Sequence, residues 1–221
     1  MRELRPGLWH WKGSHPDWNS DQPWDEQVSS YAVDDGERLL LFDPIMPPQE
    51  LDELVGQRET AIVLTAPWHE RASEALVERH GMPVYTPPPD SAQDLMDRFG
   101  ATPEQAGDGS PDVVWLLKEG KGEAHLFAPG DRLPVGVEAF RGHKPNDTML
   151  WIESKRAVVC GDTLADLGDG LAINQLWLSY WRVTREYVVE GLRPLLELPV
   201  EHVLPTHGEP ADRAALERAL A

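Results

Sequence analysis

The sequence predicts a mixed fold of the α+β or α/β class, in which two β-sheets pack face to face and helices cover the outer faces. Each half of the chain begins with β-rich runs and continues with strands that alternate with helical stretches. Such a pattern is expected when sheets are buried between helical layers. The length of 221 residues is typical of one domain, here residues 1–221, with a substantial core.

The first half begins with a β-hairpin. Residues 28–33 and 38–42 are β-rich and flank a turn that contains Asp35-Gly36. The elements expected after it are a helix at 48–58, a strand at 61–64, an amphipathic helix at 70–80, a strand at 82–85, a helix at 91–99 and a loop at 101–111. Gly81 closes the amphipathic helix, and three prolines at 87–89 separate the next strand from the next helix.

The second half repeats this order of strands followed by helices. Short β-like runs predict strands at 113–117, 124–128, 135–141, 148–153 and 156–160. A helix at 186–198 that Pro194 interrupts, a strand at 200–204 and a C-terminal helix at 212–220 complete the chain.

The charge of the chain excludes two classes of partner. Its 38 acidic and 20 basic residues give a formal net charge of −18, which repels phosphate backbones and anionic lipids. We therefore expect no nucleic-acid partner and no membrane partner. The single cysteine, Cys160, and the absence of a signal-peptide or membrane-spanning pattern indicate a cytoplasmic protein.

Nine tryptophans are many for this length. Four of them, between Trp9 and Trp24, form a Trp-rich N-terminal segment that predicts a pocket lid, a homodimer surface or simply core. The aromatic residues Trp177, Tyr180 and Trp181 equally predict a pocket wall or core packing.

Four loops follow apolar strands and carry residues of metal-ligand type. They are residues 66–71, 142–148, 161–163 and 206–210. A His or Asp at the end of a buried strand has a rigid backbone, which is the preorganisation that a ligand or a catalytic base needs. The candidates in these loops are His69, Glu70, His143, Asp162 and His207.

Together these motifs resemble the metallo-β-lactamase fold superfamily over nearly the whole chain. The matching segments are Leu41-Phe42-Asp43, Gly142-His143-Lys144-Pro145, Gly161-Asp162-Thr163-Leu164 and Leu204-Pro205-Thr206-His207-Gly208. The resemblance implies a four-layer αββα sandwich with the site at one edge of the two sheets. It also implies that His143 and His207 are metal ligands and that Asp162 bridges two metals.

The first loop departs from the family's His-x-His-x-Asp-His signature. Aligned on Leu64-Thr65, the chain has Ala66, Trp68, Glu70 and Arg71 at the four ligand positions. A register shifted by one residue restores a single His, His69, but loses the acid, so we do not adopt it. The resemblance then leaves two ligands for the first metal, which is too few for a well-held zinc, and three for the second.

The first interpretation is a metal-dependent hydrolase with a depleted site. At most one divalent metal (zinc, iron or manganese) would be held by Glu70, Asp162 and His207, with His143 or His69 assisting. Such a site would hydrolyse a small-molecule ester, thioester or lactone. His69 itself is expected to be a packed or helix-capping residue more often than a ligand.

A metal-free site is an equally open interpretation. Arg71 cannot ligate a metal, and it would instead take the metal's place and neutralise Asp162 and Glu70 through paired hydrogen bonds. The protein would then be a binding or structural protein. A metal-free hydrolase, with His143 or His207 as the general base and Asp162 orienting it, is the other form of this interpretation.

Overall fold

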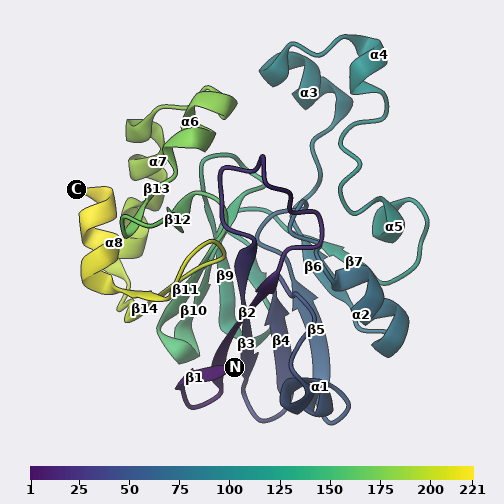
Figure 1. Ribbon diagram of the computed structural model, residues 1–221, viewed down its shortest axis with the longest axis vertical. Helices are drawn as coiled ribbons and strands as arrows, with labels where there is room; N and C mark the ends of the chain where they lie inside the picture. The colour runs from purple at the N-terminus through teal and green to yellow at the C-terminus, as the bar shows by residue number, and fades with distance from the viewer.

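The computed structural model describes residues 1–221, apart from the side chain of Val135. It has four layers, with two β-sheets in the middle and helices on both outer faces (Figure 1). The predicted αββα sandwich is thus confirmed.

The first sheet has seven strands in the order β1-β2-β3-β4-β5-β6-β7. The strands are β1 (Arg2–Arg5), β2 (Leu8–Ser14), β3 (Gln27–Asp34), β4 (Arg38–Phe42), β5 (Glu59–Val63), β6 (Val84–Thr86) and β7 (Ala124–Leu126). Strands β1 to β4 are antiparallel to their neighbours, and β4 to β7 run parallel. The parallel half places the ends of β4 and β5 side by side.

The second sheet has six strands in the order β15-β14-β11-β10-β9-β8. They are β8 (Arg132–Leu133), β9 (Val137–Arg141), β10 (Thr148–Ile152), β11 (Ala157–Cys160), β14 (His202–Pro205) and β15 (Ala211–Asp212). Strands β11 and β14 are parallel, so the loops that follow them leave the sheet at the same edge. A small separate ribbon pairs β12 (Leu164–Asp166) with β13 (Leu171–Ile173).

Three apolar layers hold the four structural layers together. The central one packs side chains of the first sheet, such as Phe42 and Val63, against those of the second, such as Leu150 and Val159. Burial of this apolar surface is the main force that joins the sheets.

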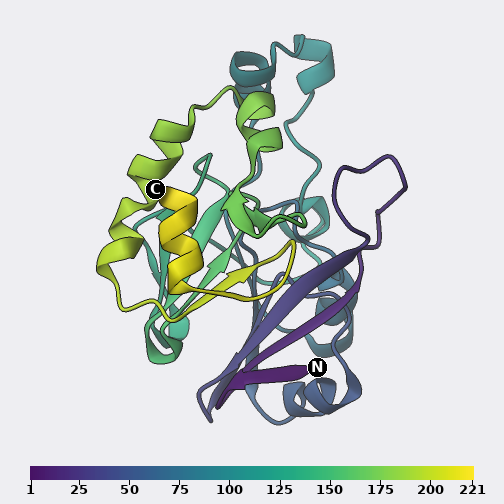
Figure 2. The same ribbon diagram turned by 60° about the vertical axis from the view of Figure 1, so that its left-hand side comes forward.

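The outer layers pack helices on each sheet, as the turned view shows (Figure 2). Helices α1 (Gln49–Val55), α2 (Ser73–His80) and α5 (Val114–Leu117) cover the first sheet. Helices α6 (Gln175–Trp181), α7 (Arg185–Leu192) and α8 (Arg213–Leu220) cover the second. Helices α3 (Ala92–Phe99) and α4 (Pro103–Ala106) lie apart from both sheets (Figure 1).

The structure corrects several expected elements. Residues 113–117 are not a strand, because Val113 has a left-handed φ of 49° and begins helix α5. The strand expected from residue 135 begins at Val137, after a 3-10 turn (Pro134–Gly136). Pro194 divides the expected helix at 186–198 into α7 and a 3-10 helix (Arg193–Glu197). The loop expected at 101–111 contains helix α4, which begins with a capping box at Thr102 and Gln105. The sequence patterns did not predict strands β1, β2, β8, β12, β13 and β15 or helix α6.

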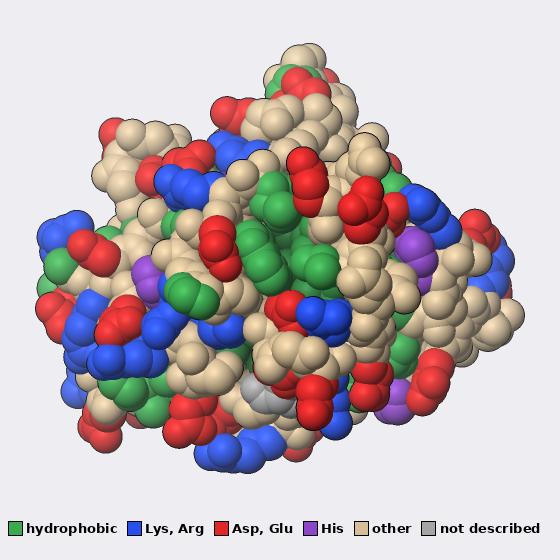
Figure 3. All heavy atoms as spheres, turned by 90° about the horizontal axis from the view of Figure 1, so that it is seen from below, with side chains coloured by type: hydrophobic (Ala, Val, Ile, Leu, Met, Phe, Trp, Pro, Cys, Tyr) green, Lys and Arg blue, Asp and Glu red, His purple; other side chains and the backbone are tan. Residues whose placement is uncertain are grey.

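The described part of the face seen from below has no separate basic patch (Figure 3). There, acidic and basic side chains are interspersed around a small hydrophobic area (Figure 3). Within the described residues, no helix is long and apolar enough to span a bilayer.

Candidate metal centre and pocket

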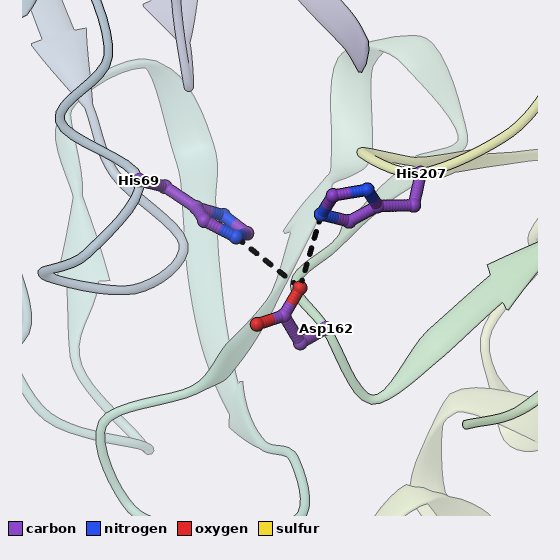
Figure 4. Close-up of side chains that lie close together, drawn as sticks. All are labelled: His69, Asp162 and His207. Carbon is purple, nitrogen blue, oxygen red and sulfur yellow. Dashed lines mark hydrogen bonds and ion pairs between the residues drawn. The ribbon is translucent and has the colours of Figure 1, made fainter. Parts of the chain in front are cut away.

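Three loops bring His69, Asp162 and His207 together at one edge of the sheets. His69 lies in the loop after β5, Asp162 follows β11, and His207 follows β14. Both imidazoles point their Nε2 atoms at the same oxygen, Asp162 Oδ1, at 3.3 Å each (Figure 4). One ligand atom from each residue lies within 4.8 Å of the others.

The ring of His69 is fixed from behind by Asp43, which follows strand β4. Asp43 Oδ2 lies 3.0 Å from His69 Nδ1 and also accepts a hydrogen bond from the Thr65 hydroxyl. Its other oxygen accepts the Thr65 backbone N–H at 2.8 Å. The His69 backbone N–H donates to the Ala66 carbonyl and so tightens the loop. Because Nδ1 is engaged, Nε2 is the atom that remains to face the site.

Asp162 is held by hydrogen bonds on both sides. Its backbone N–H donates to Asp147 Oδ1 at 2.8 Å, and Trp68 Nε1 donates to its Oδ2, also at 2.8 Å. The indole N–H thus occupies one carboxylate oxygen and leaves Oδ1 to the two imidazoles. Trp68 stands at the second His position of the expected signature, so a hydrogen-bond donor replaces a ligand there.

The buried charges shift the pKa of each member of this group. Burial alone would lower the pKa of His69, but the carboxylates of Asp162 and Asp43 outweigh it and raise this pKa to about 9. Burial would raise the pKa of Asp162, yet His69 and His207 hold it well below its usual range. Burial lowers the pKa of His207, which favours a neutral ring. Without a metal, a protonated His69 lies between two carboxylates.

The donor set fits one divalent metal. Two imidazole nitrogens and one carboxylate oxygen lie within 4.8 Å of one another, and three protein ligands are the number found in open catalytic zinc sites. The Asp43–His69 contact is the carboxylate–histidine arrangement that orients metal ligands. The set does not fit a second metal, because Ala66 has no ligand atom and an indole N–H is a donor only.

Two residues predicted for the site lie outside this group. Glu70 was expected as a ligand, but its carboxylate accepts hydrogen bonds from Trp115 Nε1 at 2.7 Å and from the Val113 N–H at 3.1 Å. Arg71 does not form the expected pair with Asp162 and Glu70. Instead its Nη1 donates to the backbone carbonyls of Ser29 and Asp43, while Nε and Nη2 are buried without a described partner.

His143 is buried beside the group and is not part of it. Its Nδ1 lies 2.7 Å from Asp147 Oδ2 and 2.9 Å from the Thr163 hydroxyl, while Nε2 has no described hydrogen-bond partner. The next residue, Lys144, is also buried and pairs with Asp90 Oδ2 at 2.6 Å. His143 was predicted to be a metal ligand or a base oriented by Asp162, but none of its described contacts is with Asp162.

The group forms the floor of a cavity of about 530 Å³. The β2–β3 loop, helix α3 with the segment after it, and helix α6 supply most of the wall. Its aromatic lining consists of Trp24, Trp68, Phe99, Trp177, Tyr180 and Trp181. The aromatic residues of helix α6 were predicted to form either a pocket wall or core, and Trp24 a pocket lid, a dimer surface or core, and the structure places all of them in the pocket wall. Trp11, from the same N-terminal segment as Trp24, packs in the core.

Sequence reasoning missed the importance of His69, although one pattern in the loop pointed to it. Thr65 and His69 are four residues apart in a turning segment, so their side chains can face the same way. Both contact Asp43, a carboxylate at the end of the neighbouring strand.

Comparison with known proteins identifies the fold. No protein-family model and no curated protein matches the sequence. The chain is similar to the solved structure of the DIM-1 metallo-β-lactamase, with a TM-score of 0.61 and 16% identity over 99% of this chain and 93% of that one. The structure of a metallo-β-lactamase family protein from Thermus thermophilus has a TM-score of 0.60 and 16% identity, over 98% of this chain and 78% of that one. A metallo-β-lactamase from Erythrobacter litoralis has a TM-score of 0.61 and 13% identity, over 99% of this chain and 93% of that one.

Proposed function

We propose that this chain, which has the metallo-β-lactamase fold, is a hydrolase that holds one divalent cation between His69, Asp162 and His207. The reaction is the cleavage of a small carboxylic ester, thioester or lactone. The observation that carries the proposal is the convergence of three ligand atoms within 4.8 Å on the floor of an aromatic-lined cavity.

The chemistry that a divalent cation supplies when bound at such a site is Lewis acidity toward a substrate carbonyl and toward water. The chain's own residues prepare the site for it. Asp43 holds His69 in one orientation, and the indole N–H of Trp68 holds Asp162. The aromatic wall takes the apolar part of the substrate and excludes bulk water from the floor.

Metal analysis of protein purified without chelator tests the proposal. We expect about one equivalent of zinc, iron or manganese per chain, and ester hydrolysis that a chelator abolishes and the metal restores. Less than about one-tenth of an equivalent after reconstitution would contradict the proposal. The matched variant is His207→Ala, which should lose both metal and hydrolysis while the fold, followed by circular dichroism, persists.

A metal-free binding protein is the second candidate, and one observation favours it. The ion pairs of His69 with Asp43 and Asp162 balance the buried charges without any cation. In this case the aromatic cavity binds a small ligand and releases it unchanged. Ligand binding by protein that contains no metal even after reconstitution, with no hydrolysis of any ester, would support this candidate.

A further inference from the structure

Part of the cavity wall is built from aromatic rings that meet edge to face. The rings of Tyr180 and Trp181 have centroids 5.0 Å apart and planes 89° apart, and Trp177 meets Tyr180 at 72°. Phe99 closes the same corner, with its centroid 4.4 Å from that of Trp181. At these spacings the rings pack edge to face against one another, and the ring faces they leave toward the cavity are the surfaces that can contact an alkylated ammonium group.

The charged residues in the lining are acidic. No lysine or arginine is among the described residues that line the cavity, whereas Asp17, Asp90, Asp112 and Asp162 are. Asp90 is neutralised by Lys144 and Asp162 by the protonated His69, and His207 also contacts Asp162. Asp17 and Asp112 take part in none of the ion pairs that the described residues form.

Asp112 forms no ion pair among the described residues, although the nearby charges of Lys144 and His69 act to lower its pKa. It is half-buried, and its charged oxygen is hydrogen-bonded by the Ser110 hydroxyl. Burial raises its pKa despite that hydrogen bond. A cation bound in the cavity would relieve this cost.

Two of the pocket rings already hold a cation of the protein itself, and the ring faces that this cation covers are not open to a ligand. The ammonium of Lys144 lies 3.5 Å from the ring centroid of Trp181 and 4.4 Å from that of Trp68. The indole of Trp68 also donates to Asp162, so the aromatic wall is continuous with the candidate metal centre. A ligand seated against the wall therefore reaches the floor of the same cavity.

We propose that the pocket selects a substrate that carries an alkylammonium or quaternary ammonium group, which the α6 rings and the unpaired carboxylates Asp17 and Asp112 recognise. The statement that this cation is attached to a scissile acyl group rests on the proposed function. The recognition of the cation does not rest on the proposed function, because it depends only on the rings and carboxylates that line the cavity.

Calorimetric titration of the chelator-treated protein tests the recognition directly. The probes are choline and 3,3-dimethyl-1-butanol, which have nearly the same shape but differ in charge. We expect choline to bind about 10-fold more tightly, within the range of cation–π and charge effects at a partly exposed site. Equal affinities, tighter binding of the alcohol, or no measurable binding of either probe would overturn the inference.

Two variants distinguish the effect of the pocket carboxylate Asp112 on choline binding from the effect of net surface charge. Asp112→Asn should weaken choline binding several-fold and leave the affinity for the neutral alcohol unchanged. Asp108→Asn is the control, because this aspartate is 93% exposed and is not among the lining residues. An equal loss in both variants would show only an effect of net charge and would also overturn the inference.

A hydrolysis experiment keeps the two proposals apart. The metal-loaded protein is given acetylcholine and its neutral analogue 3,3-dimethylbutyl acetate. Charge-selective binding without cleavage of either ester contradicts the attachment of the cation to a scissile acyl group and leaves the recognition of the cation standing. Equal cleavage of both esters, with equal binding of the two alcohols, contradicts the inference and leaves the hydrolase standing.

Discussion

Replacing His69 or its neighbour Glu70 tests which of the two residues holds the metal. His69→Gln removes one of three ligands, whereas Glu70→Gln changes a carboxylate that contacts Val113 and Trp115 instead. Zinc held by four ligands contributes on the order of 12 kcal/mol, or about 3 kcal/mol for each ligand. This figure predicts an affinity loss of about 150-fold for His69→Gln and less than about 2-fold for Glu70→Gln.

The assay is competition for zinc against a chromophoric chelator at fixed pH and ionic strength. Chemical denaturation of both metal-free variants provides the control for folding, because each substitution removes a buried or half-buried partner. A Glu70→Gln variant that loses zinc as strongly as His69→Gln would refute the assignment of His69. An unchanged affinity of His69→Gln would refute the three-residue site itself.

Three further changes follow from the same contacts. Asp43→Asn should lower metal affinity by about 10- to 100-fold in the same competition assay, because it weakens the orientation of His69. Lys144→Met should lower the free energy of unfolding by about 3–5 kcal/mol in urea, since it leaves the carboxylate of Asp90 buried and unpaired. Changing Asp90 to Leu as well should recover much of this loss. His10 gives a pH effect: burial lowers its pKa from 6.5 to about 4, so the unfolded chain binds more protons within this window. Stability should therefore decrease as the pH falls from 6.5 toward 4, and His10→Phe should flatten that part of the stability–pH profile.

The layers of the fold were predictable because hydrophobic patterns record burial. The runs that became β4, β5, β10 and β11 are apolar over several residues, as expected for strands covered on both faces. Residues 113–117 have the same apolar character, yet they form helix α5. What decides between helix and strand there is tertiary: the Val113 N–H donates to Glu70, 43 residues earlier in the chain.

The site was predictable in part, since a strand end can be located from the sequence but the direction of a side chain in the following loop cannot. Asp162 and His207 sit where the loop motifs indicated. His69 turns inward because Asp43, 26 residues away, accepts its ring N–H. Glu70 turns outward because Trp115 and Val113 bind its carboxylate. These partners are distant in sequence, so the spacing of Thr65 and His69 within the loop could suggest a shared side but could not identify Asp43, Val113 or Trp115 as the partners.

The balance of charge around the centre favours the proposed single metal over two. Burial lowers the pKa of Arg71, although the nearby carboxylates of Asp43 and Asp162 act in the opposite direction. An arginine keeps its charge under such conditions. Without a metal, the positive charges of Arg71 and protonated His69 therefore balance the negative charges of Asp43 and Asp162.

Under the proposed function, one divalent cation in place of the His69 proton would leave a single excess positive charge, opposite in sign to an oxyanion of acyl transfer. A second divalent cation would leave three. The loop that carries His69 also carries Arg71, so a proposed metal ligand and a fixed positive charge lie two residues apart, and the charge of Arg71 opposes a second cation.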